Sequence, residues 1–311
     1  MPELPEVETV RRGLNRKTLH QPIQGGDVLL ARTIAYPSTI SEFLVGLEGT
    51  TIATWYRRGK YLLAELVRDG VGKGDGGDKE DEEDKGGMIR PAISPFSSSP
   101  PAAGYLGVHL RMTGQLLWLP PSEPPQKHTR VRLFLGDDRE LRFVDQRTFG
   151  QMWWVPPGQP PEQVITGLQA LGPEPFSEQF SVVYLIDQLR DRRRPIKNAL
   201  LDQALVAGVG NIYADEALFL SGIHPTTLCS DLQQFQIERL RSNIIRVLEA
   251  SIAAGGTTIS TFRDLAGVNG NYGGVAWVYG RDGDDCRQCG TVIQRLKLAG
   301  RSAHFCPTCQ L

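Results

Sequence analysis

The chain of 311 residues lacks a long apolar segment. None of its apolar runs approaches the roughly 20 residues that are needed to span a bilayer. The N-terminal segment contains Glu3, Glu6 and Glu8 and therefore does not have the basic and apolar pattern of a secretory signal peptide. The sequence argues against a membrane protein, and we expect a cytoplasmic one.

The chain also has few cysteines and a net charge close to zero. The chain has five cysteines, and four of them form two pairs at metal-binding spacing rather than a secreted disulfide framework. The formal net charge of −1 argues at first against a nucleic-acid partner. However, segment 69–103 contains eight acidic and four basic residues, which leaves 30 basic and 27 acidic residues elsewhere. Several of the remaining arginines are clustered, at Arg11-Arg12, Arg57-Arg58 and Arg192-Arg193-Arg194.

The first 155 residues have the pattern of a β domain that begins with one helix. Val7, Val10 and Leu14 lie at helical spacing between Pro5 and about Leu19. Segments rich in β-branched and aromatic residues then predict an antiparallel sandwich or barrel, with strands at 28–31, 51–56, 61–66, 106–110, 115–118, 131–135, 140–143 and 151–155. Segment 69–103 has almost no apolar content, and we expect it to be a disordered acidic and Pro/Ser-rich insertion.

The second half of the chain has a helical pattern. A Pro- and Gly-rich linker is expected at 156–165, followed by a helical domain at 166–256. Its expected helices are 181–190, 195–206, 211–220 and 231–253, and Gly208-Val209-Gly210 separates the second from the third. A glycine-rich loop at 257–280 leads to a small module at 281–311. The predicted fold class is α+β, with an N-terminal β domain, a helical domain and a metal module.

The C-terminal module has the cysteine spacing of a zinc site. Two CxxC pairs are separated by 16 residues, and they consist of Cys286 and Cys289, then Cys306 and Cys309. Four thiolates leave no open coordination position for water, so we expect one structural zinc ion and no metal catalysis. The hairpin between the pairs carries Arg295, Lys297 and Arg301, which either contact DNA or are ordinary solvated charges.

The N-terminus suggests covalent chemistry. Removal of Met1 would expose Pro2 as a secondary amine, and α-amino groups titrate near pKa ~7.7–8.0, well below the ~10.4 of lysine. Attack of this amine on an aldehyde-like carbon gives a cationic iminium, which is the intermediate of covalent catalysis at a sugar C1′. The alternative is that Pro2 only terminates the chain. Glu3 and Glu6 share one face of the expected helix, where stabilisation of the helix dipole is the simpler role.

Taken together, these residues resemble the formamidopyrimidine-DNA glycosylase family of bacterial repair enzymes. The resemblance covers nearly the whole chain apart from the insertion, and it rests on the zinc finger and on the motifs PELPEVET at 2–9, RGKY at 58–61, HLRMTG at 109–114, DQRTFG at 145–150, GVGNIYA at 208–214 and GGTT at 255–258. It implies a helix–two-turns–helix element in the helical domain. It also implies a bifunctional DNA glycosylase and AP lyase of base excision repair, which we expect to be a monomer.

The resemblance implies that oxidised purines, namely 8-oxoguanine and formamidopyrimidines, are flipped out of double-stranded DNA and excised. Pro2 would form a Schiff base at C1′, and Glu3 would be the general acid and base at the sugar. Lys60 would assist β-elimination and hold a phosphate. Arg301 would support δ-elimination and bind the backbone beside the lesion. Glu6 would support the site from the helix face that it shares with Glu3.

Further residues would contact the DNA. Met112, Arg147 and Phe149 match the family's residues that fill the space left by the extruded base, although core packing is the simpler role for Met112 and Phe149. Asn211, at a helix start, would bind a phosphate. Further phosphate contacts are expected from His128, Arg193 and Lys197.

The resemblance also implies that the loop at 257–280 closes over the flipped base, where its glycines would let backbone N–H groups approach the lesion. Arg111 departs from the family pattern, in which glycine usually precedes the methionine.

Two other functions remain open from the sequence. Endonuclease VIII, which acts on oxidised pyrimidines, is related, but Leu4-Pro5 and Arg147-Thr148-Phe149 favour the purine enzyme. A non-catalytic DNA-binding zinc protein would keep the basic clusters and the cysteines, but it would not need Pro2, Glu3 and Lys60 together.

Overall fold

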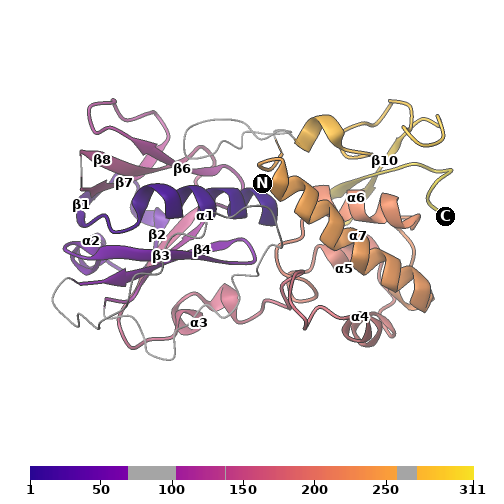
Figure 1. Cartoon of the computed structure of the whole chain (residues 1–311), viewed down its shortest axis with the longest axis horizontal. Coiled ribbons are helices and arrows are strands. Elements are labelled where there is room, and N and C mark those ends of the chain that lie inside the picture. The colour runs from indigo at the N-terminus through magenta and orange to yellow at the C-terminus, as the bar shows by residue number, and fades with distance from the viewer. Residues whose placement is uncertain (69–102, 137, 258–271) are drawn as a thin grey trace, which may run out of the picture. The chain divides into compact units, whose positions relative to one another are not determined.

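The computed structural model describes residues 1–68, 103–136, 138–257 and 272–311 (Figure 1). The predicted insertion, apart from Ala103, and most of the predicted loop at 257–280 lie outside the described residues. No described helix is long and apolar enough to cross a membrane. The chain divides into two compact units. Unit 1 comprises Met1–Val10, Arg58–Tyr61 and Thr166–Leu311, and unit 2 comprises Arg11–Arg57 and Leu62–Ile165.

Unit 2 is built on two sheets. The four-stranded sheet is antiparallel, with the order β1 (Ile23–Val28), β7 (Thr129–Leu135), β8 (Arg139–Asp145) and β6 (Gly114–Leu119). The five-stranded sheet has the order β2 (Ile34–Tyr36), β9 (Gln151–Val155), β5 (Tyr105–His109), β4 (Tyr61–Val67) and β3 (Thr51–Arg58). β2 runs parallel to β9, whereas β5 runs antiparallel to it. The short helix α3 (Pro161–Val164) follows β9.

Helix α1 (Leu4–Thr18) confirms the expected N-terminal helix, and its second half packs on β3. The side chain of Asn15 accepts a hydrogen bond from the backbone N–H of Trp55 at 2.8 Å and donates to its carbonyl at 3.2 Å. The Trp55 indole N–H donates to the Thr18 hydroxyl at 2.9 Å. Because Trp55 is fully buried, these bonds satisfy polar groups that burial would otherwise leave unpaired.

The strand expected at 28–31 is wrong. β1 ends at Val28, and Ala31–Thr33 forms a 3-10 turn. β1 is an irregular strand with a bulge between Ile23 and Gly25, and a Cβ on Gly26 would lie 2.4 Å from the carbonyl oxygen of Arg132. This close backbone approach, rather than an apolar pattern, defines the strand. Three elements of unit 2 were not expected from the sequence, namely β2, helix α2 (Ile40–Leu47) and helix α3, which lies in the predicted linker.

Besides the first half of α1, the described part of unit 1 contains four α-helices: α4 (Val182–Leu189), α5 (Ile196–Leu200), α6 (Asn211–Ser221) and α7 (Gln234–Ala253). The helix expected at 195–206 ends early, because the Asp202 side chain accepts a hydrogen bond from the backbone N–H of Ala204 at 3.0 Å and forms a turn. α7 begins after Gln233, which forms a capping box with Gln236. The helix expected from residue 231 therefore starts three residues later.

α6 is buried along nearly its whole length, and α7 packs against it. The α7 stripe that faces the core has helical spacing, with Ile237, Leu240, Ile244, Val247 and Leu248. The C-terminal hairpin consists of β10 (Gln294–Leu298) and β11 (Arg301–Phe305), drawn in yellow in Figure 1. A small apolar cluster joins it to α6, with members Phe219, Val278, Cys286, Ile293 and Cys306.

Candidate active site

A glycine loop in unit 1 lies directly against the start of the chain. Gly208 has φ +88°, and a Cβ there would lie 2.7 Å from the Leu4 side chain. The Gly208 carbonyl accepts a hydrogen bond from the Leu4 N–H at 3.0 Å. A Cβ on Gly210 would lie 2.3 Å from the carboxyl carbon of Glu3. Both glycines are therefore needed here to let Glu3 and Leu4 approach the loop.

The Glu3 carboxyl group is buried at the N-terminus of α6. Its Oε1 accepts a hydrogen bond from the Ile212 N–H at 3.0 Å, while its buried Oε2 has no hydrogen-bond partner among the described residues. Burial raises the pKa of Glu3, whereas Lys60 and the α6 backbone N–H groups lower it. One carboxylate oxygen is thus fixed by the helix and the other remains available for proton transfer.

Lys60 is held beside Glu3 by the turn between β3 and β4. Its side chain is 6% exposed, and its Nζ donates to the Val209 carbonyl at 3.0 Å. Burial lowers the pKa of Lys60, the charges of Glu3 and Glu6 raise it, and Arg301 lowers it further. The lysine therefore lies in one electrostatic cluster with the two carboxyl groups and Arg301.

Glu174 fixes the turn that carries Lys60. Its Oε1 accepts hydrogen bonds from the Gly59 N–H at 2.6 Å and from the Arg58 guanidinium at 3.2 Å. Arg58 also donates to the Gly172 carbonyl at 2.7 Å. These bonds, all within unit 1, fix Arg58 and Gly59 on a loop of the same unit and so determine where Lys60 projects.

Glu6 lies at the centre of a buried network. Its carboxylate accepts hydrogen bonds from the Glu3 N–H at 2.8 Å, the Tyr213 hydroxyl at 2.6 Å and the Thr257 N–H at 2.9 Å. Burial and the charge of Glu3 raise the pKa of Glu6 to about 7, against the lowering effect of these donors. Glu6 therefore holds the backbone of Glu3 and changes its charge near neutral pH.

The N-terminus belongs to the same group of charges. Pro2 is buried, and burial lowers the pKa of the Met1 amino group. Glu3 and Glu6 raise that pKa, and Lys60 and Arg301 lower it. Arg301 is an exposed residue at the first position of β11. Unit 1 thus brings the N-terminus of the chain, next to Pro2, into electrostatic range of Glu3, Glu6, Lys60 and Arg301.

Asn211 opens α6 next to the C-terminal hairpin. Its Nδ2 lies 3.4 Å from the Ser302 hydroxyl, while its buried Oδ1 has no partner among the described residues. Burial raises the pKa of the nearby Tyr279, and a hydrogen bond with the Asn211 side chain lowers it. Asn211, Tyr279 and the hairpin therefore converge at one helix N-terminus.

Lys197 does not have the exposure that a direct phosphate contact requires. Its side chain is fully buried, and its ammonium group donates to the Asp215 carboxylate and to the Ser302 carbonyl. The second Asp215 oxygen accepts hydrogen bonds from the backbone N–H of His304, at 3.0 Å, and from its ring. The ion pair joins α5 to α6, and the hydrogen bonds of its two partners tie β11 to both helices. Arg193, by contrast, is exposed, as expected for a DNA contact.

The expected void-filling residues lie on loops of unit 2. Phe149 is 52% exposed, so core packing does not explain it. The Arg147 guanidinium carbon lies 5.1 Å from the centre of the Phe149 ring. Met112 is half-buried, and so is His128, whose Nδ1 lies 3.2 Å from the Arg130 guanidinium. An exposed aromatic ring beside a cation is suited to contact a base stack.

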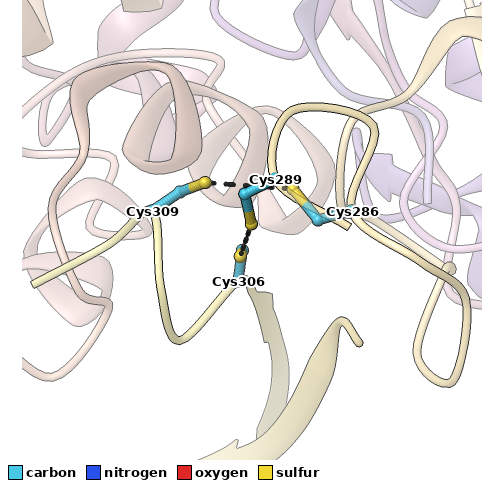
Figure 2. A group of neighbouring side chains, drawn as sticks. All are labelled: Cys286, Cys289, Cys306 and Cys309. Atoms are coloured by element: carbon cyan, nitrogen blue, oxygen red, sulfur yellow. Dashed lines mark hydrogen bonds between the residues drawn. The ribbon is translucent and has the colours of Figure 1, made fainter. Parts of the chain in front are cut away.

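The four expected cysteines converge at the base of the hairpin (Figure 2). Their sulfur atoms lie within 4.8 Å of one another, with Cys286 and Cys309 separated by 3.9 Å and Cys289 and Cys306 by 3.4 Å. Tetrahedral zinc with Zn–S bonds of about 2.3 Å requires sulfur separations of about 3.8 Å. Four thiolates at this spacing fit one structural zinc ion, which would fix the hairpin that carries Arg301.

Loss of one ligand should release this ion. We expect Cys289→Ser to remove most of the zinc and to expose the hairpin to proteolysis, because metal binding supplies folding free energy in such modules. Cys229→Ser is the matched control, since Cys229 is buried outside the cluster. Zinc content per chain, measured by mass spectrometry of the metal, checks this. Equal zinc in both variants would contradict the assignment.

Several residues that shape the site were not identified from the sequence. Glu174 fixes the Lys60 turn, and Asp215 fixes β11. Glu216 accepts hydrogen bonds from the consecutive backbone N–H groups of Trp277, Val278 and Tyr279, at 2.8 to 2.9 Å. In the sequence, the only signal for these three acidic residues was their position near a glycine or near an expected helix start. That position does not show which buried groups they contact in the fold.

Three family models match the chain in order. They are the formamidopyrimidine-DNA glycosylase N-terminal domain at residues 1–152, the formamidopyrimidine-DNA glycosylase H2TH domain at 171–263, and the zinc finger found in FPG and IleRS at 283–311. The chain is also similar to curated formamidopyrimidine-DNA glycosylases. The protein from Nostoc punctiforme is 62% identical over 310 residues, with 100% of this chain and 96% of the relative covered. The protein from Acaryochloris marina is 61% identical, with 100% and 99% covered.

The chain is also similar to solved structures of formamidopyrimidine-DNA glycosylases. A mutant FPG from Lactococcus lactis in complex with DNA containing Fapy-dG matches with a TM-score of 0.82 and 33% identity, and 99% of each chain is covered. The Lactococcus lactis Fpg in complex with DNA containing an abasic site also matches with a TM-score of 0.82, 33% identity and 99% coverage of each chain.

Proposed function

Because this chain belongs to the formamidopyrimidine-DNA glycosylase family, we propose that it excises oxidised purines from double-stranded DNA through a Schiff base on Pro2. Family membership makes it a DNA glycosylase and AP lyase of base excision repair. The Lactococcus lactis relatives bind DNA with Fapy-dG or with an abasic site, which correspond to a substrate and to the product of base removal. These relatives support an oxidised purine, rather than a pyrimidine, as the substrate here.

The observation that carries the proposal is the buried, half-satisfied carboxyl group of Glu3 next to Pro2. Its Oε1 is fixed by the Ile212 N–H, and its Oε2 has no partner among the described residues. Lys60 and Arg301 contribute positive charge to the same cluster. A structural carboxyl group would have both oxygens satisfied, whereas a catalytic one needs a free oxygen toward the substrate.

The chemistry begins with base release. The Pro2 nitrogen attacks C1′ as the glycosidic bond breaks, and the bonding electrons leave with the base, which takes up a proton. Glu3 protonates the ring oxygen O4′ as the sugar opens, and the Pro2 nitrogen becomes a cationic iminium. The raised pKa of Glu3, which follows from burial, favours the protonated form that this step needs.

Strand scission follows from the same intermediate. The iminium acidifies the hydrogen on C2′, and its removal expels the 3′ phosphate in β-elimination. Lys60 assists this step, because burial lowers its pKa and makes proton transfer easier. Arg301 supports the second, δ-elimination of the 5′ phosphate, and hydrolysis of the imine returns the free Pro2 amine. Zinc has no part in these steps beyond holding the hairpin.

The DNA contacts complete the proposal. Met112, Arg147 and Phe149 would occupy the space left by the extruded base, and His128, Arg193 and Asn211 would bind phosphates. We propose that the three domains comprise residues 1–155, 166–256 and 281–311, with a linker at 156–165 and a loop at 257–280. We also propose that the protein acts in the cytoplasm as a monomer. A single chain carries every residue that the reaction requires, which supports the monomer.

Borohydride trapping tests the function and the lesion class together. Reduction of the iminium links protein and DNA covalently, so we expect strong trapping on duplexes with 8-oxoguanine and little on duplexes with thymine glycol or undamaged sequence. Strong preference for thymine glycol would assign the chain to the endonuclease VIII specificity instead. Absence of trapping on all lesions would support a DNA-binding protein without catalysis.

A further inference from the structure

One buried carboxylate at the end of β8 holds together the loops that carry the expected DNA contacts of unit 2. Asp145 is 1% exposed. Its Oδ1 accepts hydrogen bonds from the Thr113 hydroxyl at 2.5 Å and from the Arg147 N–H at 3.2 Å. Its Oδ2 accepts one from the Gly150 N–H at 2.7 Å. Charge-assisted bonds of this kind are about twice as strong as neutral ones, so the carboxylate is a firm anchor.

The backbone of Asp145 reaches a third loop. Its N–H donates to the His128 carbonyl at 2.9 Å, and its carbonyl accepts from the Arg130 guanidinium at 2.8 Å. Thr113 adds a direct link, because its hydroxyl also accepts a hydrogen bond from the Arg147 N–H at 2.9 Å. Three loops therefore meet at one residue, and they carry Met112, the pair Arg147 and Phe149, and His128.

These loops adopt backbone conformations that need support. Arg111 has φ +54° and Thr148 has φ +60°, both in the left-handed backbone region that residues other than glycine rarely adopt. Gly150 has no room for a side chain, since a Cβ would lie 2.4 Å from the Phe143 ring. Such conformations persist only where surrounding bonds hold them. Asp145 and Thr113 bind the backbone N–H groups of Arg147 and Gly150 on either side of Thr148, whereas the Arg111 N–H donates to the His109 ring at 3.0 Å.

The tip of the loop that carries Phe149 is exposed, whereas Asp145 at its base is buried. Phe149 is 52% exposed although it is large and apolar, and Arg147 stacks over it. The buried Asp145 carboxylate thus supports loops whose exposed Phe149 ring and Arg147 guanidinium are ordered before DNA binds. Loops that are already ordered lose less conformational entropy when they enter DNA.

We propose that Asp145 and Thr113, here called the loop clamp, are positioning residues that hold Met112, Arg147 and Phe149 ready to replace the extruded base. The proposal rests on the function proposed above. The clamp does not touch the sugar, so it should affect extrusion of a paired base rather than the chemistry at C1′. An abasic site, which has no base to unstack, should depend on it much less.

The matched pair Thr113→Val and Thr113→Ser tests this. Valine keeps the shape and removes the hydroxyl, whereas serine keeps the hydroxyl. Loss of the hydrogen bonds to Asp145 and Arg147 should lower kcat/KM for excision of 8-oxoguanine opposite cytosine about 10- to 100-fold. The same Thr113→Val protein should incise a preformed abasic site within about twofold of the wild type, and Thr113→Ser should resemble the wild type in both assays.

A fluorescent base analogue placed beside the lesion provides a second readout, because unstacking increases its emission. Thr113→Val should slow or reduce this signal, and Asp145→Asn should do so more strongly if its far-UV spectrum is unchanged. Equal loss of excision and abasic-site incision would identify a merely structural role and overturn the proposal, and so would unchanged excision. Wild-type trapping on abasic DNA distinguishes these results from failure of the proposed function.

Discussion

Replacement of Glu3 by glutamine is expected to lower base excision by about 10²- to 10⁴-fold, the range that a general acid and base contributes. Glutamine preserves the shape of the side chain beside Gly210 and can still accept the hydrogen bond from Ile212. It cannot donate a proton to O4′ and recover it. Single-turnover excision of 8-oxoguanine, measured with DNA binding on the same protein, separates lost chemistry from lost affinity.

The proposed role of Glu3 also predicts how base excision depends on pH. Burial raises the pKa of Glu3, so its proton is retained to higher pH than in an ordinary carboxyl group. Wild-type excision should fall on the alkaline side as that proton is lost, and the Glu3→Gln variant should lose this limb. Glu238→Gln, on the exposed face of α7, is the matched control and should behave as the wild type. A Glu3→Gln protein with near-normal excision would remove the carboxyl group from the mechanism.

Retention of Met1 is expected to remove most of the base excision activity. With Met1 in place the Pro2 nitrogen is part of a peptide bond and has no free electron pair for attack. The only terminal amine is then displaced by one residue, about 3.8 Å along the chain. Excision should fall by about a thousandfold or more, as expected when a covalent catalyst loses its nucleophile.

The comparison can be made within one preparation. Partial inhibition of methionine aminopeptidase during expression yields chains with and without Met1, which differ by the mass of one methionine residue. Both forms should bind abasic DNA with similar affinity, because the residues expected to contact the phosphates and the base stack are the same in both. If the form with Met1 formed borohydride-stable adducts as efficiently as the processed form, Pro2 would not be the nucleophile.

The sequence predicted the elements with strong apolar periods, and it failed where backbone contacts define the structure. α1 and α6 begin within one residue of their expected starts, because cap position and apolar spacing agree there. β1 was placed too late, since its Gly25-Gly26 pair has no side-chain pattern and pairs with β7 through close backbone approach. β2 has only three residues and left no periodic signal.

For the site, the sequence indicated residue types but not their surroundings. The motif Gly208-Val209-Gly210 was interpreted as a break between helices, whereas its glycines also make room for Glu3 and Leu4. Lys197 was expected to contact a phosphate, but its side chain is fully buried. Its buried partner Asp215 lies 18 positions away, and only the fold reveals that pair.

The central claim is that the Pro2 nitrogen forms the covalent intermediate. The most direct test is to trap the wild-type protein on 8-oxoguanine DNA with borohydride, digest it, and locate the modified residue by tandem mass spectrometry. We predict that the reduced sugar is attached to the N-terminal peptide at Pro2, in chains that have lost Met1. Attachment to Lys60 or another lysine, with an unmodified Pro2, would contradict the mechanism.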